Sequence, residues 1–212
     1  MQETTDYQAV RRLLFYEKGA MSFQAREIDH EVLEKILNSS TSCAWLGKWK
    51  LVSVTKKENI VKVVESWQNG LRKIGQNRDV EFVERWKKAP LLIAFCQPRK
   101  LDQFHFVVGD LVRIFSVQEI GTAVRSVELA ALAHGIGLHG IMGILVPEVV
   151  ELISEVLGIP RNDEIVYFGL MGYPDEEVAQ KFPRLNEVCY AEIGDFLQHR
   201  PNAYERFLAL SD

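Results

Sequence analysis

A cluster of glycines between residues 135 and 143 is the first feature of the sequence that could bind a ligand. Gly135, Gly137, Gly140 and Gly143 stand within nine residues, directly after a helical pattern. Glycine permits positive φ angles and lets backbone amides approach a phosphate or a flat ring closely. The cluster follows a helix and lacks a Gly-Lys-Ser/Thr ending, so it is neither a dinucleotide fingerprint nor a Walker loop. Two interpretations stay open: a ligand-binding loop, or a tight helix-to-strand connection.

Basic residues near both ends of the chain could clamp a phosphate group. Guanidinium groups bind phosphate through paired hydrogen bonds, and an ammonium group binds it as a point charge. The alternative is that these side chains are ordinary solvated surface cations. The candidates are Arg11, Arg12 and Lys18 near the start, and Lys181 and Arg184 near the end.

Two histidines flank the glycine cluster, and three cysteines are scattered along the chain. His134 and His139 could donate protons, because imidazole titrates near neutral pH. Cys43, Cys96 and Cys189 are odd in number and far apart, which favours neither a disulfide framework nor a metal site. We therefore expect each cysteine to be a small buried hydrophobe. No Gly-x-Ser-x-Gly or His-Glu-x-x-His motif indicates a hydrolase or a zinc peptidase.

The composition is that of a globular domain. The chain has 212 residues, of which 47% are hydrophobic and 25% charged, and its net charge is −4. This charge favours neither nucleic acid nor an anionic membrane as a partner. The start lacks the pattern of a secretory signal, and no apolar run approaches the ~20 residues that a membrane-spanning helix needs. We expect a cytoplasmic protein with one α+β domain over residues 1–212, whose residues 175–212 form a C-terminal extension.

The elements that must position these residues follow from hydrophobic periodicity and from helix-capping and turn residues. The pattern alternates between helical and strand-like segments. The predicted strand at 89–96 is a continuous apolar run, which indicates a strand covered on both faces. We expect helices over 29–37, 117–134 and 149–157, one or two exposed helices within 56–88 with a break at 75–77, and strands over 49–54, 89–96 and 164–174.

The order of these motifs resembles the nitroreductase family of FMN-dependent oxidoreductases over nearly the whole chain. A helix and a serine-rich loop lead to Trp49, and a small-residue helix later runs into the glycine cluster. The strongest likeness is Leu-Gly-Ile-Pro at 157–160 followed by Gly-Tyr-Pro at 172–174. The resemblance implies an α+β fold with a central, mostly antiparallel sheet flanked by helices. It also implies a homodimer with an exchanged C-terminal arm, in which residues 175–212 pack on the partner subunit.

The resemblance further implies a cofactor and a set of residues that bind it. FMN would lie at the dimer interface, take electrons from NAD(P)H and pass them to a small-molecule electron acceptor such as a nitroaromatic or a quinone. Ser42 matches the serine of the family's Pro-Ser-x-x-Asn-x-Gln-Pro-Trp loop, but Trp45 and Gly47 stand at its Asn and Gln positions. The cofactor-binding set carried over is Lys18 in one N-terminal register or Arg11 and Arg12 in another, Ser42, backbone groups of Gly143, Ile144 and Leu145, and Lys181 or Arg184.

Two hypotheses about function follow from this comparison. The first is a flavin-dependent NAD(P)H oxidoreductase, in which the cofactor carries the chemistry and no catalytic triad is needed. The second is a nitroreductase-like fold that has lost catalysis and acts as a dimeric binding or structural protein. The altered loop before Trp49 favours the second hypothesis, and the glycine cluster and basic tail favour the first.

Overall fold

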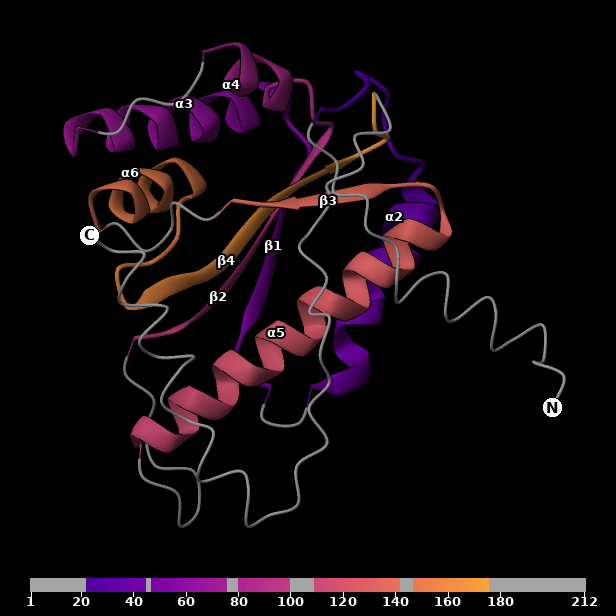
Figure 1. Ribbon diagram of the computed structural model, residues 1–212. Coiled ribbons are helices and arrows are strands. Elements are labelled where there is room, and N and C mark those ends of the chain that lie inside the picture. Colours follow the sequence, from indigo (N-terminus) through magenta and orange to yellow (C-terminus); the bar gives the residue numbers. More distant parts are fainter. Residues whose placement is uncertain (1–21, 45–46, 76–79, 100–108, 142–146, 176–212) are drawn as a thin grey trace, which may run out of the picture. The chain divides into compact units, whose positions relative to one another are not determined.

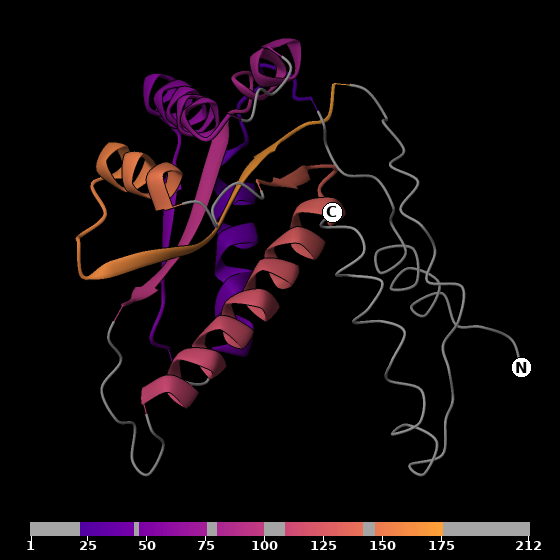
Figure 2. The same cartoon turned by 60° about the vertical axis from the view of Figure 1, so that its left-hand side comes forward.

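The computed structural model describes residues 22–44, 47–75, 80–99, 109–141 and 147–175. The predicted α+β class is confirmed: within these residues, helices cover both faces of one four-stranded sheet (Figures 1 and 2). The elements are α2 (His30–Asn38), the 3-10 helix η1 (Ser39–Cys43), β1 (Lys50–Val54), α3 (Lys57–Lys73), α4 (Val80–Trp86), β2 (Leu91–Pro98), α5 (Gly109–Ala133), β3 (Gly137–Gly140), α6 (Pro147–Leu157) and β4 (Asp163–Gly172).

The sheet is antiparallel throughout its described part, with the strand order β1-β2-β4-β3. β2 lies in the middle, and its pairing with β4 runs from Leu91 opposite Met171 to Pro98 opposite Asp163. A register shift between Phe95 and Cys96 interrupts this pairing. Outside the named strands, Phe23 and Pro174 form a single antiparallel β-bridge.

Each face of the sheet has its own hydrophobic core. On one face, Leu92, Ala94 and Cys96 of β2 pack with α3, α4 and α6. On the other, Leu91, Ile93 and Phe95 pack with α2 and α5. Side chains alternate between the two faces of a strand, so a strand covered on both sides must be apolar at every position. This confirms the interpretation of the continuous apolar run.

Helix ends follow the predicted signals. The Asp29 side chain accepts hydrogen bonds from the backbone N–H groups of Glu31 and Val32, as an N-cap should. Gly158, with a φ of 64°, ends α6, and the N–H of Ile159 donates to the carbonyl of Ser154. The predicted break at 75–77 separates α3 from α4.

The long helix starts earlier than the sequence predicts. α5 begins at Gly109, whereas the periodic pattern predicts a start at Val117. Val112 is buried, but Leu111, Ile114 and Phe115 are exposed, so the first two turns show no single apolar stripe facing the core. Hydrophobic periodicity therefore did not predict the first part of the helix, residues 109–116.

None of the helices in the described part combines the length and apolar character that a bilayer crossing requires. The predicted extension over 175–212 lies outside the described residues apart from Asp175, so its packing on a partner and the single-domain boundary stay predictions.

Candidate functional site

Ser42 lies on η1, a short 3-10 helix that is stabilised by hydrogen bonds from its side-chain hydroxyl groups. The Oγ of Ser39 donates to the carbonyl of Ile36 at 2.6 Å, and the Oγ of Ser42 donates to the carbonyl of Ser39 at 2.7 Å. Hydroxyls that bond to backbone three residues back favour such tight turns. Ser42 is exposed, and η1 packs along α5. Since a hydroxyl can donate and accept together, a flavin group that bonds Ser42 in this geometry must donate to its oxygen.

The connection from η1 to β1 is fixed at two described positions. The N–H of Gly47 donates to a carboxylate oxygen of Glu119 on α5 at 3.3 Å. Gly47 has a φ of 59°, a region that glycine enters without strain. Trp49 then packs against Phe95, with ring centroids 5.5 Å apart. Trp45 lies outside the described residues, so its contact with a flavin or with the core stays a prediction.

Three of the four glycines in the cluster serve the fold. Gly135 has a φ of 71° and ends α5, while Gly137 and Gly140 belong to β3. A Cβ atom added at Gly140 would stand 2.9 Å from the hydroxyl of Tyr167, so glycine there makes room for the phenol. The interpretation as a helix-to-strand connection is therefore confirmed for residues 135–140. Gly143, which would meet the flavin together with Ile144 and Leu145, lies with them outside the described residues.

The two histidines beside the cluster differ in environment. His134 is exposed at the end of α5, whereas the ring of His139 lies against Trp86 with centroids 4.8 Å apart. Burial lowers the pKa of His139 to about 4. Burial thus favours the uncharged imidazole at neutral pH, and a proton-donating role for either histidine stays a prediction.

The predicted phosphate clamp cannot be placed, because all five basic candidates lie outside the described residues. These are Arg11, Arg12, Lys18, Lys181 and Arg184. Of the cysteines, Cys96 is described and is the buried small hydrophobe that we expect, and burial raises the pKa of its thiol to about 12.

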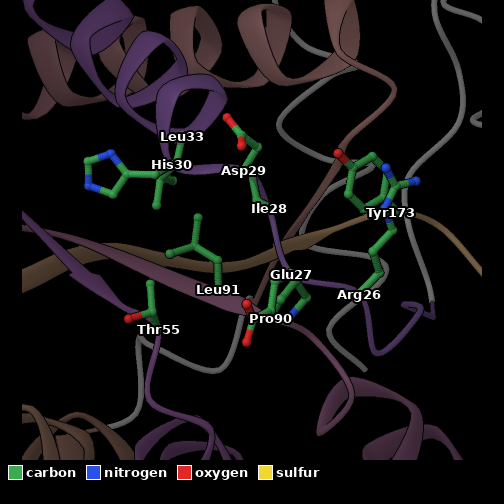
Figure 3. Close-up of a pocket in the computed structure, with 10 residues that line it drawn as sticks. All are labelled: Arg26, Glu27, Ile28, Asp29, His30, Leu33, Thr55, Pro90, Leu91 and Tyr173. Atoms are coloured by element: carbon green, nitrogen blue, oxygen red, sulfur yellow. The ribbon is translucent and has the colours of Figure 1, made fainter.

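No motif in the sequence indicates the pocket of about 640 Å³ that lies beside the start of α2 (Figure 3). Arg26 lies over the ring of Tyr173, 3.9 Å from its centroid, at one side of the pocket (Figure 3). Carboxylates from Glu27 and Asp29 stand beside apolar side chains from α2 and β2, so the lining is of mixed character. The pocket is formed by Arg26, Glu27, Ile28, Asp29, His30, Leu33, Thr55, Pro90, Leu91 and Tyr173.

Comparison with known proteins identifies the family. The sequence model of the nitroreductase family matches residues 22–173, a range that contains every element described above. The chain belongs to the nitroreductase family. As a member, it is a flavin-dependent oxidoreductase, and the family resemblance expected from the sequence motifs is confirmed.

Individual relatives are distant from this nitroreductase family member. A curated protein of Archaeoglobus fulgidus, whose name proposes NADH dehydrogenase or NAD(P)H nitroreductase activity, is 23% identical over 78% of this chain and 86% of its own length. The NADPH:FMN oxidoreductase of Vibrio harveyi, solved with NAD⁺, has 19% identity and a TM-score of 0.65, covering 95% of this chain and 85% of that one.

Two further solved structures share the fold. Nitroreductase A of Vibrio parahaemolyticus has 21% identity and a TM-score of 0.64, covering 96% of this chain and 86% of that one. An FMN-dependent nitroreductase of Clostridium difficile has 20% identity and a TM-score of 0.61, covering 81% and 91%. These likenesses confirm the expected nitroreductase-like sheet flanked by helices.

Proposed function

We propose that the protein is a homodimeric, FMN-dependent NAD(P)H oxidoreductase that reduces nitroaromatics, quinones or related small acceptors. The observation that carries this proposal is the family match over residues 22–173, which includes both Ser42 and the glycine cluster. The solved relatives named for FMN and NADPH chemistry support the choice of cofactor and reductant.

The described residues beside Ser42 fit a flat cofactor with polar edges. Thr41 and Ser42 are exposed on η1, which packs along α5. Exposed hydroxyl groups suit the rim of a ring that hydrogen-bonds at its edge.

In the proposed mechanism the chain positions the cofactor and a substrate. The flavin, when bound, takes up hydride from NAD(P)H and passes electrons to the acceptor. Ser42 would accept a hydrogen bond from the rim of the ring. Backbone groups of Gly143, Ile144 and Leu145 would contact the ring, and Lys181 or Arg184 with Lys18 or Arg11 and Arg12 would bind the phosphate.

The first test is flavin binding by the purified protein. We expect the absorption bands of bound flavin, and a rise in melting temperature on addition of FMN, because a ligand that binds only the folded state stabilises it. Oxidation of NADH or NADPH should then depend on FMN and a quinone or nitroaromatic. Absence of both binding and thermal stabilisation would remove the basis of the proposal.

A second variant set tests the placement of the cofactor. We expect Arg184→Ala to weaken FMN binding without changing the melting temperature of the apoprotein. Unchanged affinity would count against Arg184 as a phosphate ligand. Ser42→Ala should also weaken binding, and Ser53→Ala, the same change at an exposed position of β1, is its matched control.

A binding protein without catalysis is the second candidate function. Trp45 and Gly47 at the family's Asn and Gln positions favour it, because two side-chain amides that would meet the flavin are missing. FMN binding without any NAD(P)H oxidation over a range of acceptors would support this alternative.

An apolar strip on α5 supports the homodimer. Large side chains at spacings of three and four residues are exposed there, with exposed fractions of 48% for Leu111, 52% for Ile114 and 38% for Phe115. Such a strip on a helix indicates an interface, and a second copy of the chain is the proposed occupant. Ile114→Asp should shift the species in sedimentation from dimer to monomer. Ile74→Asp, an exposed apolar residue at the end of α3, is the control.

A further inference from the structure

A buried carboxylate on α5 contacts the connection that follows Ser42. Glu119 is only 8% exposed, although burying an ionised carboxylate without hydrogen-bond partners costs several kcal/mol. One of its partners is the backbone N–H of Gly47, 72 positions away in the sequence, at 3.3 Å. Hydrogen bonds to an ionised acceptor are stronger than neutral ones, so this bond holds Gly47 against α5.

The position of Glu119 departs from the pattern of its helix. Val112, Ser116, Ile120 and Ala123 form the buried side of α5, and Glu119 lies on the same side. An apolar residue would suit that side better, and departures from local rules of this kind concentrate at functional sites. We therefore attribute the carboxylate at this position to its contact with Gly47.

Gly47 has the conformation that this contact requires. Its φ of 59° lies in the left-handed region, and a Cβ atom there would meet nothing within 4 Å, so the backbone angle explains the glycine and crowding does not. Gly47 itself offers no side-chain amide.

We propose that Glu119 is a positioning residue of the flavin site: α5, along which η1 with Ser42 packs, also holds the N–H of Gly47 through this carboxylate, so Ser42 and Gly47 are placed against the same helix. This inference rests on the proposed function. Where the family loop has an amide side chain at position 47, this chain has a glycine whose backbone is held from α5. The carboxylate takes no part in electron transfer.

The experiment compares Glu119→Ala and Glu119→Gln with the wild type. We expect Glu119→Ala to weaken FMN binding about tenfold, the effect of losing one charge-assisted hydrogen bond, and Glu119→Gln to weaken it less, because an amide oxygen still accepts. Glu155→Gln, the same change at an exposed position of α6, should leave the affinity unchanged. KM for the acceptor should change less than the dissociation constant of FMN.

Hydrogen exchange separates positioning from a general loss of stability. The Gly47 amide should exchange faster in Glu119→Ala, while the amides of Ile93 and Ala94 in central β2 keep their protection. Equal loss of protection in β2, or unchanged exchange at Gly47, would overturn the inference. Glu119→Gln, which preserves the side-chain shape, provides the same comparison if Glu119→Ala does not fold.

The two readouts also separate this inference from the proposed function. If the wild type binds no FMN, the proposed function fails, and faster exchange at Gly47 would still show that Glu119 holds this connection. If the wild type binds FMN and both variants bind it equally well, the function stands and the positioning role of Glu119 is wrong.

Discussion

Replacement of Gly70 by alanine should destabilise the protein, although alanine is the better helix former. Gly70 is a buried position of α3, and a Cβ atom there would stand 2.5 Å from Cγ2 and 3.0 Å from Cα of Val149 on α6. Carbon atoms in contact prefer separations of about 3.5–4.0 Å, so α3 and α6 must move apart. Because one of the two close atoms is backbone, a change of the Val149 rotamer can relieve only the contact with Cγ2.

The magnitude follows from two opposing terms. Alanine gains about 1 kcal/mol over glycine in a helix interior, and overpacking of this severity costs about 3 kcal/mol. The net loss is about 2 kcal/mol, or roughly 4–8 °C in melting temperature for a domain of this size. Thermal unfolding followed by circular dichroism, at fixed protein and cofactor concentration, measures the shift.

Two controls make the test specific. Asn69→Ala introduces the same residue at the neighbouring exposed position of α3, and should stabilise the protein by about 0.5 kcal/mol. In the double variant Gly70→Ala/Val149→Ala the effects should sum to less than the two single losses, because the shortened side chain leaves space for the new methyl group. A rise in melting temperature for Gly70→Ala, or strict additivity in the double variant, would refute the packing argument.

Three further predictions concern charge and backbone conformation. Burial lowers the pKa of His139 to about 4, so the unfolded imidazole takes up a proton below a pH of about 6.5 while the folded one does not. Stability should fall by up to about 3 kcal/mol as the pH decreases across that range, and His139→Phe should remove this dependence in urea unfolding. Lys50→Ala should destabilise the protein by about 1–3 kcal/mol, because the Asp163 side chain, 8% exposed, would lose the ammonium partner at 2.7 Å. Calorimetry of Lys50→Ala and Lys50→Arg measures the loss of stability. An equally large loss in Lys50→Arg, which keeps the charge, would argue against a charge effect. Gly158→Ala should lower the free energy of unfolding by about 1 kcal/mol. The φ of 64° alone accounts for this loss, because an added Cβ atom meets nothing within 4 Å. An unchanged midpoint of chemical unfolding would contradict the helix-end conformation.

Local signals predicted most of the fold. Asp29 before an apolar stripe identified the start of α2, and Gly158 followed by a proline identified the end of α6, because caps depend on residues a few positions apart. The uninterrupted apolar run of β2 predicted a central strand, because a strand needs apolar residues at every position only when both of its faces are covered. The start of α5 was missed because apolar residues also lie on its exposed side.

The candidate site was less predictable, because its contacts join distant positions. No spacing rule relates Glu119 to Gly47, and a glutamate within a long helix is usually a solvated residue. The pocket beside α2 likewise combines Arg26 with Tyr173, which the pairing of residues 22–24 with 173–175 brings together. His139 shows the opposite case, because the sequence indicates a titrating group and burial lowers its pKa to about 4.

The two cores on opposite faces of the sheet have a consequence for how this protein can change over time. The Ser42 and Glu119 contacts lie on the α5 face, whereas Gly70 and Val149 pack on the other. Distant positions without shared partners contribute independently to stability. Mutations that alter ligand preference on one side can therefore accumulate while the opposite side keeps the chain folded. This independence gives a physical reason why proteins with 19–21% identity retain the same architecture.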